Sequence, residues 1–131
     1  MYFLDTNICI YILNNKYPYL KQRLLNCSMG SVKMPSVVYY ELCHGVEKSG
    51  QRALSFERLS QFVSHIEIVP FDKTAAEIAG KIRADLEKTE QVIGGNDIII
   101  AATTLANNAT LITNNLREFE RVGGLAVKNW V

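Results

Sequence analysis

The sequence predicts an α/β fold in which a central parallel sheet is flanked by helices on both faces. Short apolar segments typical of buried strands alternate with longer segments whose apolar residues recur at helical spacing. Strands joined through helices pair in parallel by right-handed crossovers, and the helices then cover the sheet. No linker-like tract or repeat divides the 131 residues, so we expect one domain over residues 1–131.

In the N-terminal half, the apolar residues 2–4 are expected to form a buried strand that ends at Asp5. Thr6 or Asn7 is expected to cap a helix that continues to about residue 13. Ser36 is expected to cap a later helix, directly after Pro35. The other elements predicted in this half are a helix over 18–26, a strand over 32–34, a helix from 36 to about 48, and a helix over 52–62.

In the C-terminal half, residues 65–69 alternate in polarity like a strand and stop at Pro70. Asp72 is expected to cap a long helix whose apolar residues recur at helical spacing. A glycine pair then breaks the chain, and Asn96 or Asp97 is expected to start the next helix. The last elements predicted are a strand over 110–113, a short turn or helix over 115–119, and an edge strand over 126–127.

Composition limits the cellular setting more than the activity. The net charge of +1 argues neither for nor against a nucleic-acid partner. The three cysteines are odd in number and lack Cys-x-x-Cys spacing, which indicates free thiols in a reducing cytoplasm. No apolar run is long enough to span a bilayer, and the N-terminus lacks the basic region of a signal peptide. We therefore expect a cytoplasmic protein without a membrane partner.

Three carboxylates each stand alone in a long uncharged stretch. Asp5, Glu41 and Asp97 are the only charged side chains within residues 1–15, 34–46 and 91–116, respectively. A carboxylate in apolar surroundings is costly unless it is neutralised, paired or bound to a cation, and no Lys or Arg is local to any of the three. We therefore expect them to meet around a divalent ion. An all-oxygen ligand set suits Mg²⁺ or Mn²⁺. The alternative is three separate helix caps or surface acids.

The predicted fold can bring these three carboxylates together. In open parallel sheets, the functional crevice lies beyond the carboxyl ends of the strands. Asp5 ends the first strand, and Asp97 opens a helix, where the macrodipole favours negative charge. Glu41 lies about one and a half turns into its helix, where its side chain can point back over the end of the sheet.

Four segments, taken in order, carry a family resemblance. They read FLDTNICIYIL, VVYYELCHGVEKS around Glu41, IGGNDIIIAA, and LITNNLREFERVGGL followed by KNW near the end. Together they resemble the PIN-domain ribonucleases, and most closely the VapC type of bacterial toxin–antitoxin systems. The resemblance covers essentially the whole chain. It implies a single PIN domain that acts as a metal-dependent endoribonuclease toxin.

The resemblance also implies roles, a cofactor and partners. Asp5 and Asp97 match the metal-binding aspartates of the family, and Glu41 matches its third acid. The supporting positions that match are Thr6 and Asn7 after the first aspartate, and Thr113 near the end of the later strand. The family implies Mg²⁺ or Mn²⁺, a structured RNA substrate that is often tRNA, a homodimer, and a VapB-like antitoxin partner in a bacterial or archaeal cytoplasm.

At one position the chain departs from the family pattern. Asn115 stands where many PIN domains have a fourth acid. Glu118, three residues later, is expected to fill that role through a water molecule, and the alternative is that Asn115 binds through its carbonyl. The departure does not affect the expected site of the first metal ion, but it leaves undecided whether a second metal ion binds.

Rival functions make different demands on the sequence. A phosphatase with Asp5 as nucleophile would want a second Asp where Asn7 stands. A phosphate-acceptor signalling domain would need paired acids after its first strand and an Asp at the end of a central strand, whereas Asp97 follows a glycine break. A catalytically inactive PIN module that only binds is a third alternative, against which the intact acid trio argues. Because no residue pattern supports a protein nucleophile, we expect direct attack by metal-activated water.

Candidate RNA contacts are fewer. Arg117 and Arg121 follow the strand near the site, and Lys48 ends a helix, so all three are candidates for phosphate contacts, with solvated surface as the alternative. Tyr39 and Tyr40 can stack on a base, but packing in the core or at a dimer contact is the favoured reading.

Overall fold

The computed structural model describes residues 1–131 and contains one five-stranded sheet. The strand order is β3-β2-β1-β4-β5, and every neighbouring pair is parallel. The strands are β1 (Tyr2–Leu4), β2 (Val32–Pro35), β3 (Glu67–Val69), β4 (Thr110–Ile112) and β5 (Ala126–Lys128). The predicted parallel α/β fold is confirmed, with the last strand at an edge of the sheet.

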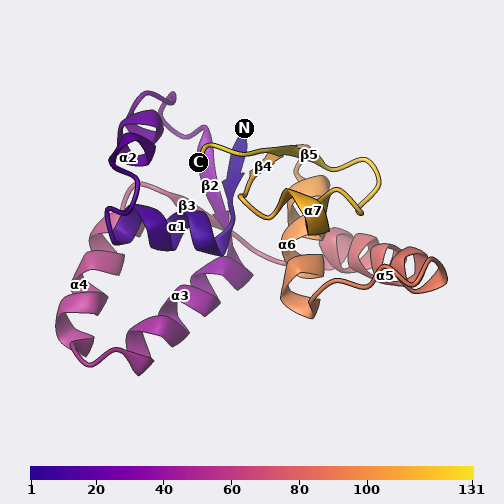
Figure 1. Ribbon diagram of the computed structural model, residues 1–131, viewed down its shortest axis with the longest axis horizontal. Coiled ribbons are helices and arrows are strands. Elements are labelled where there is room, and N and C mark those ends of the chain that lie inside the picture. Colours follow the sequence, from indigo (N-terminus) through magenta and orange to yellow (C-terminus); the bar gives the residue numbers. More distant parts are fainter.

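Helices cover both faces of this sheet. The chain steps in one direction from β1 to β3 and in the opposite direction from β3 to β5, so right-handed crossovers place the two sets of helices on opposite faces. Figure 1 shows α1 to α4 on one side of the strands and α5 to α7 on the other. The helices are α1 (Thr6–Leu13), α2 (Pro18–Leu25), α3 (Ser36–Lys48), α4 (Arg52–Val63), α5 (Lys73–Lys88), α6 (Gly95–Ala106) and α7 (Leu116–Phe119). None of them combines the length and apolar character needed to cross a membrane.

The core forms around the two central strands. Phe3 and Leu4 of β1 point to opposite faces of the sheet, yet neither is exposed, and Leu111 and Ile112 of β4 are buried in the same way. Such two-sided burial is typical of a parallel sheet between two layers of helices. It fixes the carboxyl ends of β1 and β4 side by side, where Leu4 pairs with Ile112.

The first helix begins differently from the prediction. Asp5, rather than Thr6 or Asn7, is the N-cap of α1, because Asp5 still has extended backbone angles and its side chain accepts a hydrogen bond from the Thr6 N–H at 2.7 Å. Thr6 is already helical. Asp5 therefore caps a helix and is also one of the three isolated carboxylates. A role as a helix cap does not exclude a role as a metal ligand.

Two other helix starts also differ, and one agrees. Pro35 rather than Ser36 precedes the first helical turn of α3, and no side chain caps that turn. Helix α6 begins at Gly95, before either residue predicted to start it, since Gly94 is the last extended residue. Asp72 caps α5 as predicted, and accepts a hydrogen bond from the Ala75 N–H at 2.9 Å.

Candidate functional site

Asp5 lies at the carboxyl end of β1 with both of its side-chain oxygens held. The Thr6 N–H donates to Asp5 Oδ1 at 2.7 Å, and the Thr113 hydroxyl donates to Asp5 Oδ2 at 2.7 Å. Thr113 directly follows β4, so the pairing of β1 with β4 is what brings these two residues together. Asp5 is only 5% exposed and Thr113 is fully buried, so the carboxylate has one fixed orientation.

Glu41 reaches the same edge of the sheet from α3. The Thr6 hydroxyl donates to Glu41 Oε1 at 2.8 Å, while the backbone N–H of the same residue donates to Asp5. Thr6 therefore ties the two acids to each other through one residue. The side chain of Asn7 is exposed and forms no hydrogen bond, so the structure gives Asn7 no comparable contact.

Asp97 and Glu118 complete the group from the other side. Asp97 lies in the first turn of α6, and Glu118 lies in α7. The Asn115 side-chain amide donates to Glu118 Oε2 at 3.0 Å, and the Asn115 N–H donates to the Thr113 hydroxyl at 2.9 Å. Asn115 therefore orients Glu118, and Glu118 in turn raises the pKa of Asp97.

The pKa values show that the acids share one environment. Burial, together with the charge of Asp5, the adjoining Glu118 and the charge of Glu41, raises the pKa of Asp97 to about 7. Burial also raises the pKa of Asp5, against the hydrogen bonds from Thr113 and Thr6, which lower it. The ion pairs of the protein all lie elsewhere, and none includes one of these acids. No ion pair therefore offsets the repulsion among these acids.

The acids are not assembled into a ready-made metal cage. No three His, Cys, Asp or Glu side chains in the structure are close enough together to hold a metal ion. The three carboxylates thus lie at the same edge of the sheet, as predicted, but they are not in contact around one point. The donor chemistry still fits Mg²⁺ or Mn²⁺, because Mg²⁺ keeps several waters and binds directly to one or two carboxylates. Asp5 and Asp97 could ligate such an ion directly, with Glu41 and Glu118 acting through water.

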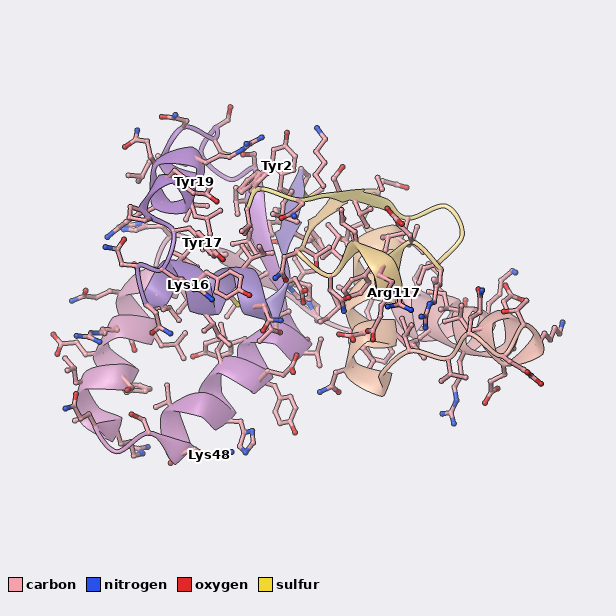
Figure 2. The ribbon with its side chains drawn as sticks, in the orientation of Figure 1. Tyr2, Lys16, Tyr17, Tyr19, Lys48 and Arg117 are labelled. Atoms are coloured by element: carbon pink, nitrogen blue, oxygen red, sulfur yellow. The ribbon has the colours of Figure 1, made fainter.

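The predicted basic contacts are dispersed. Arg117 is exposed on α7, next to Glu118, and has no acidic partner. Arg121 donates to the Val92 carbonyl at 3.2 Å, and this contact connects the segment after α7 to the loop before α6. Lys48 lies at the far end of α3, well separated from Arg117 in Figure 2. The structure therefore brings only Arg117 beside the acids.

Two features near the acids were not found from the sequence. A groove of about 280 Å³ between α1, α3 and α4 includes Glu41 in its lining, together with Ile10, Leu42 and Arg58. The Asn114 amide donates to the Tyr11 hydroxyl at 3.0 Å, across 103 positions of sequence. The groove depends on how α3 and α4 pack, which no local pattern encodes. Asn114 lies within one of the segments that carry the family resemblance, but nothing in that segment pointed to Tyr11.

The two tyrosines considered for base stacking differ in exposure, since Tyr39 is half-buried and Tyr40 is 61% exposed.

Comparison with known proteins gives consistent matches along the chain. A family model described as the PIN domain matches residues 2–125. The chain is 39% identical over 132 residues to ribonuclease VapC2 of Rickettsia felis, covering 99% of this chain and 98% of that protein. It is 38% identical to the tRNA(fMet)-specific endonuclease VapC of Shigella flexneri, covering 98% and 97% of the two chains. The crystal structure of VapBC2 from Rickettsia felis bound to a DNA fragment from their promoter contains a similar chain, with a TM-score of 0.94, 37% identity, and coverage of 99% of this chain and 98% of that one.

Proposed function

Since this chain belongs to the PIN-domain family, and within it to the VapC ribonucleases, we propose that it is a Mg²⁺- or Mn²⁺-dependent endoribonuclease toxin of a type II toxin–antitoxin system. The observation that carries the metal dependence is the group Asp5, Glu41, Asp97 and Glu118, which are acids with no basic partner at the carboxyl edge of the sheet. Structured RNA is the proposed substrate, with tRNA first, because one relative is named a tRNA(fMet)-specific endonuclease.

The residues of this chain have distinct tasks in this proposal. Asp5 and Asp97 would hold the cation directly, and Glu41 and Glu118 would contact it through water. When bound, the cation would offset charge on the phosphodiester oxygens and lower the pKa of the attacking water. Thr113 orients Asp5, and its hydrogen bond favours the charged form of the carboxyl against the effect of burial. The exposed Arg117 is placed to contact a phosphate beside the acids.

A VapB-like antitoxin is the proposed protein partner, since a VapBC complex contains a chain of this fold. The groove between α1, α3 and α4 is the proposed seat of an antitoxin segment. Ile10 and Leu42 give this groove apolar anchors, and Glu41 joins it to the acids. An Arg from that segment would pair with the carboxylates through its bidentate fork, and would thereby exclude the cation. A homodimer, as the family resemblance implies, is also predicted and can be tested by measuring the mass in solution.

Expression in a bacterial host tests the toxin proposal. The wild-type chain should arrest growth and produce cleaved tRNA, and co-expression of the antitoxin encoded beside it should restore growth. Asp5→Asn should relieve the arrest, whereas Asp85→Asn should not, because Asp85 is an exposed acid on α5 that pairs with Lys81. Free accumulation of the wild-type protein without effect on growth or RNA would contradict the proposal and favour an inactive PIN-type binding module.

A second variant tests the groove separately. Ile10 is 37% exposed, so Ile10→Lys should fold normally and should retain RNA cleavage. It should weaken antitoxin binding by placing a charge among apolar contacts. Unchanged antitoxin affinity of Ile10→Lys would move the partner to another surface while leaving the nuclease proposal intact.

A further inference from the structure

Every charged side chain in the stretch between the first two acids of the site is basic. Residues 6–40 contain no Asp or Glu, although the whole chain has a net charge of only +1. Of the basic residues in this stretch, Lys33 pairs with Glu67, whereas Lys16, Lys21 and Arg23 have no acidic partner. All three lie in the turn before α2 or within α2 itself. One corner of the molecule is therefore positively charged and lacks compensation within the chain.

Tyrosine rings interleave with this charge. The Lys16 ammonium lies 4.8 Å from the centre of the Tyr11 ring and 5.5 Å from the centre of the Tyr17 ring. The rings of Tyr11 and Tyr17 pack edge to face with their centres 5.2 Å apart, and the ring centres of Tyr17 and Tyr19 are 5.8 Å apart. We call Tyr11, Lys16, Tyr17 and Tyr19 the tyrosine–lysine cluster. Figure 2 shows Lys16, Tyr17 and Tyr19 one above another along the face formed by α1 and α2.

The tyrosine–lysine cluster is partly open to solvent and held in place, since Tyr11 and Tyr17 are half-buried against the core. Tyr19 is 50% exposed, and Lys16 is exposed and makes no side-chain hydrogen bond. Asn15 turns the chain with a positive φ of 53°, a conformation that Asn tolerates, and Pro18 opens α2. The Lys16 N–H donates to the Tyr11 carbonyl at 3.0 Å, which fixes the turn against α1. The rings and the charge are thus presented on a preformed surface.

A hydrogen bond connects the tyrosine–lysine cluster to the acids. The Asn114 amide donates to the Tyr11 hydroxyl at 3.0 Å, and Asn114 directly follows Thr113, whose hydroxyl donates to Asp5. The cluster therefore borders the carboxyl edge of the sheet, on the side opposite to Arg117 in Figure 2. A chain that crosses the acids can contact the cluster on one side and Arg117 on the other.

We propose that the tyrosine–lysine cluster is an RNA-binding subsite, which stacks an unpaired base next to the scissile phosphodiester while Lys16 contacts a phosphate. This proposal rests on the proposed ribonuclease function. Aromatic rings interleaved with basic side chains are the surface that binds unpaired nucleotides, because every base can stack and every linkage is anionic. The acids repel RNA, so substrate binding needs a positive surface beside them. An antitoxin segment that carries an Arg to the acids would be repelled by Lys16, Lys21 and Arg23.

RNA affinity measured without cleavage tests the proposal even if the protein proves inactive. The probes are total bacterial tRNA and single-stranded polyuridine, titrated against Asp5→Asn protein in EDTA. Adding Lys16→Gln should weaken both affinities about tenfold at low salt, and should reduce the slope of log affinity against log salt by about one. Tyr19→Leu should weaken polyuridine binding with the salt slope unchanged. Lys16→Arg should retain wild-type affinity.

Lys73→Gln removes an exposed charge on α5 and should leave RNA affinity unchanged, and melting curves should show that every variant is folded. If the protein cleaves RNA, Lys16→Gln should raise KM with little change in kcat. RNA affinity of Lys16→Gln and Tyr19→Leu equal to that of the parent would overturn the subsite, as would a loss confined to antitoxin binding. A wild-type protein that binds RNA but does not cleave it would instead count against the proposed function and leave the subsite standing.

Discussion

The Thr113 hydroxyl donates a 2.7 Å hydrogen bond to Asp5 Oδ2, and so bridges the carboxyl ends of β4 and β1. The same hydroxyl accepts the Asn115 N–H at 2.9 Å, and the Asn115 side chain donates to Glu118. One chain of hydrogen bonds therefore runs from Asp5 to Glu118 beneath the acids. Because neither Asp5 nor Glu118 forms an ion pair with a basic residue, this chain of hydrogen bonds is what orients these two carboxylates.

Thr113→Val tests this bridge, because valine has nearly the same shape but no hydroxyl. Asp5 Oδ2 and the Asn115 N–H would both lose a partner in a buried place. We expect a loss of about 1–3 kcal/mol in the free energy of unfolding at pH 7, measured by urea denaturation, together with weaker Mn²⁺ binding. Thr113→Ser keeps the hydroxyl and should retain Mn²⁺ binding. Wild-type stability and metal affinity in Thr113→Val would contradict the bridging role.

The raised pKa of Asp97 predicts how stability depends on pH without metal. An unperturbed Asp titrates near 3.8, whereas the folded protein holds the Asp97 proton until about pH 7. Between these values the folded state binds more protons than the unfolded state, so stability falls as pH rises from about 4 to 7. The melting temperature in EDTA should be lower at pH 8 than at pH 5. Asp97→Asn should flatten this dependence, and equal slopes in the two proteins would exclude Asp97 as its source.

Glu41→Gln should separate stability from activity. The glutamine Oε1 can still accept the Thr6 hydroxyl, and removing the charge relieves repulsion with Asp5. We expect the melting temperature in EDTA to be unchanged or higher, while RNA cleavage falls. A strong loss of stability for Glu41→Gln in EDTA would mean that the charge of Glu41 has a structural role.

Glu118 and Asn115 can be ranked as the fourth element of the site. Asn115 donates its amide to Glu118, which leaves the carboxylate as the better ligand for a cation. Glu118→Gln should therefore lower Mn²⁺ affinity more than Asn115→Ala does, as measured by calorimetry. The opposite ranking would assign the role to the Asn115 carbonyl.

The sequence predicted the parts of the fold and site that follow from local pattern. Apolar segments located the strands, and the end of β1 placed Asp5 at the functional edge of a parallel sheet. The sequence did not show that Asp5 itself caps α1, because Thr6 and Asn7 are also residue types that favour the capping position. Hydrogen bonds between residues distant in sequence could not be predicted either. The contact between Tyr11 and Asn114 depends on the pairing of β1 with β4, which brings the segment after β4 beside α1.

Cleavage of bacterial tRNA by the purified protein, with Mn²⁺ or Mg²⁺ and with EDTA, tests the central claim most directly. The account predicts cleavage that requires the metal, and that falls by orders of magnitude in Asp5→Asn and in Asp97→Asn while both variants remain folded. The exposed-acid control Asp85→Asn should cleave like the wild type. Undiminished cleavage in EDTA, or full activity of both site variants, would contradict a metal-dependent ribonuclease built on Asp5 and Asp97.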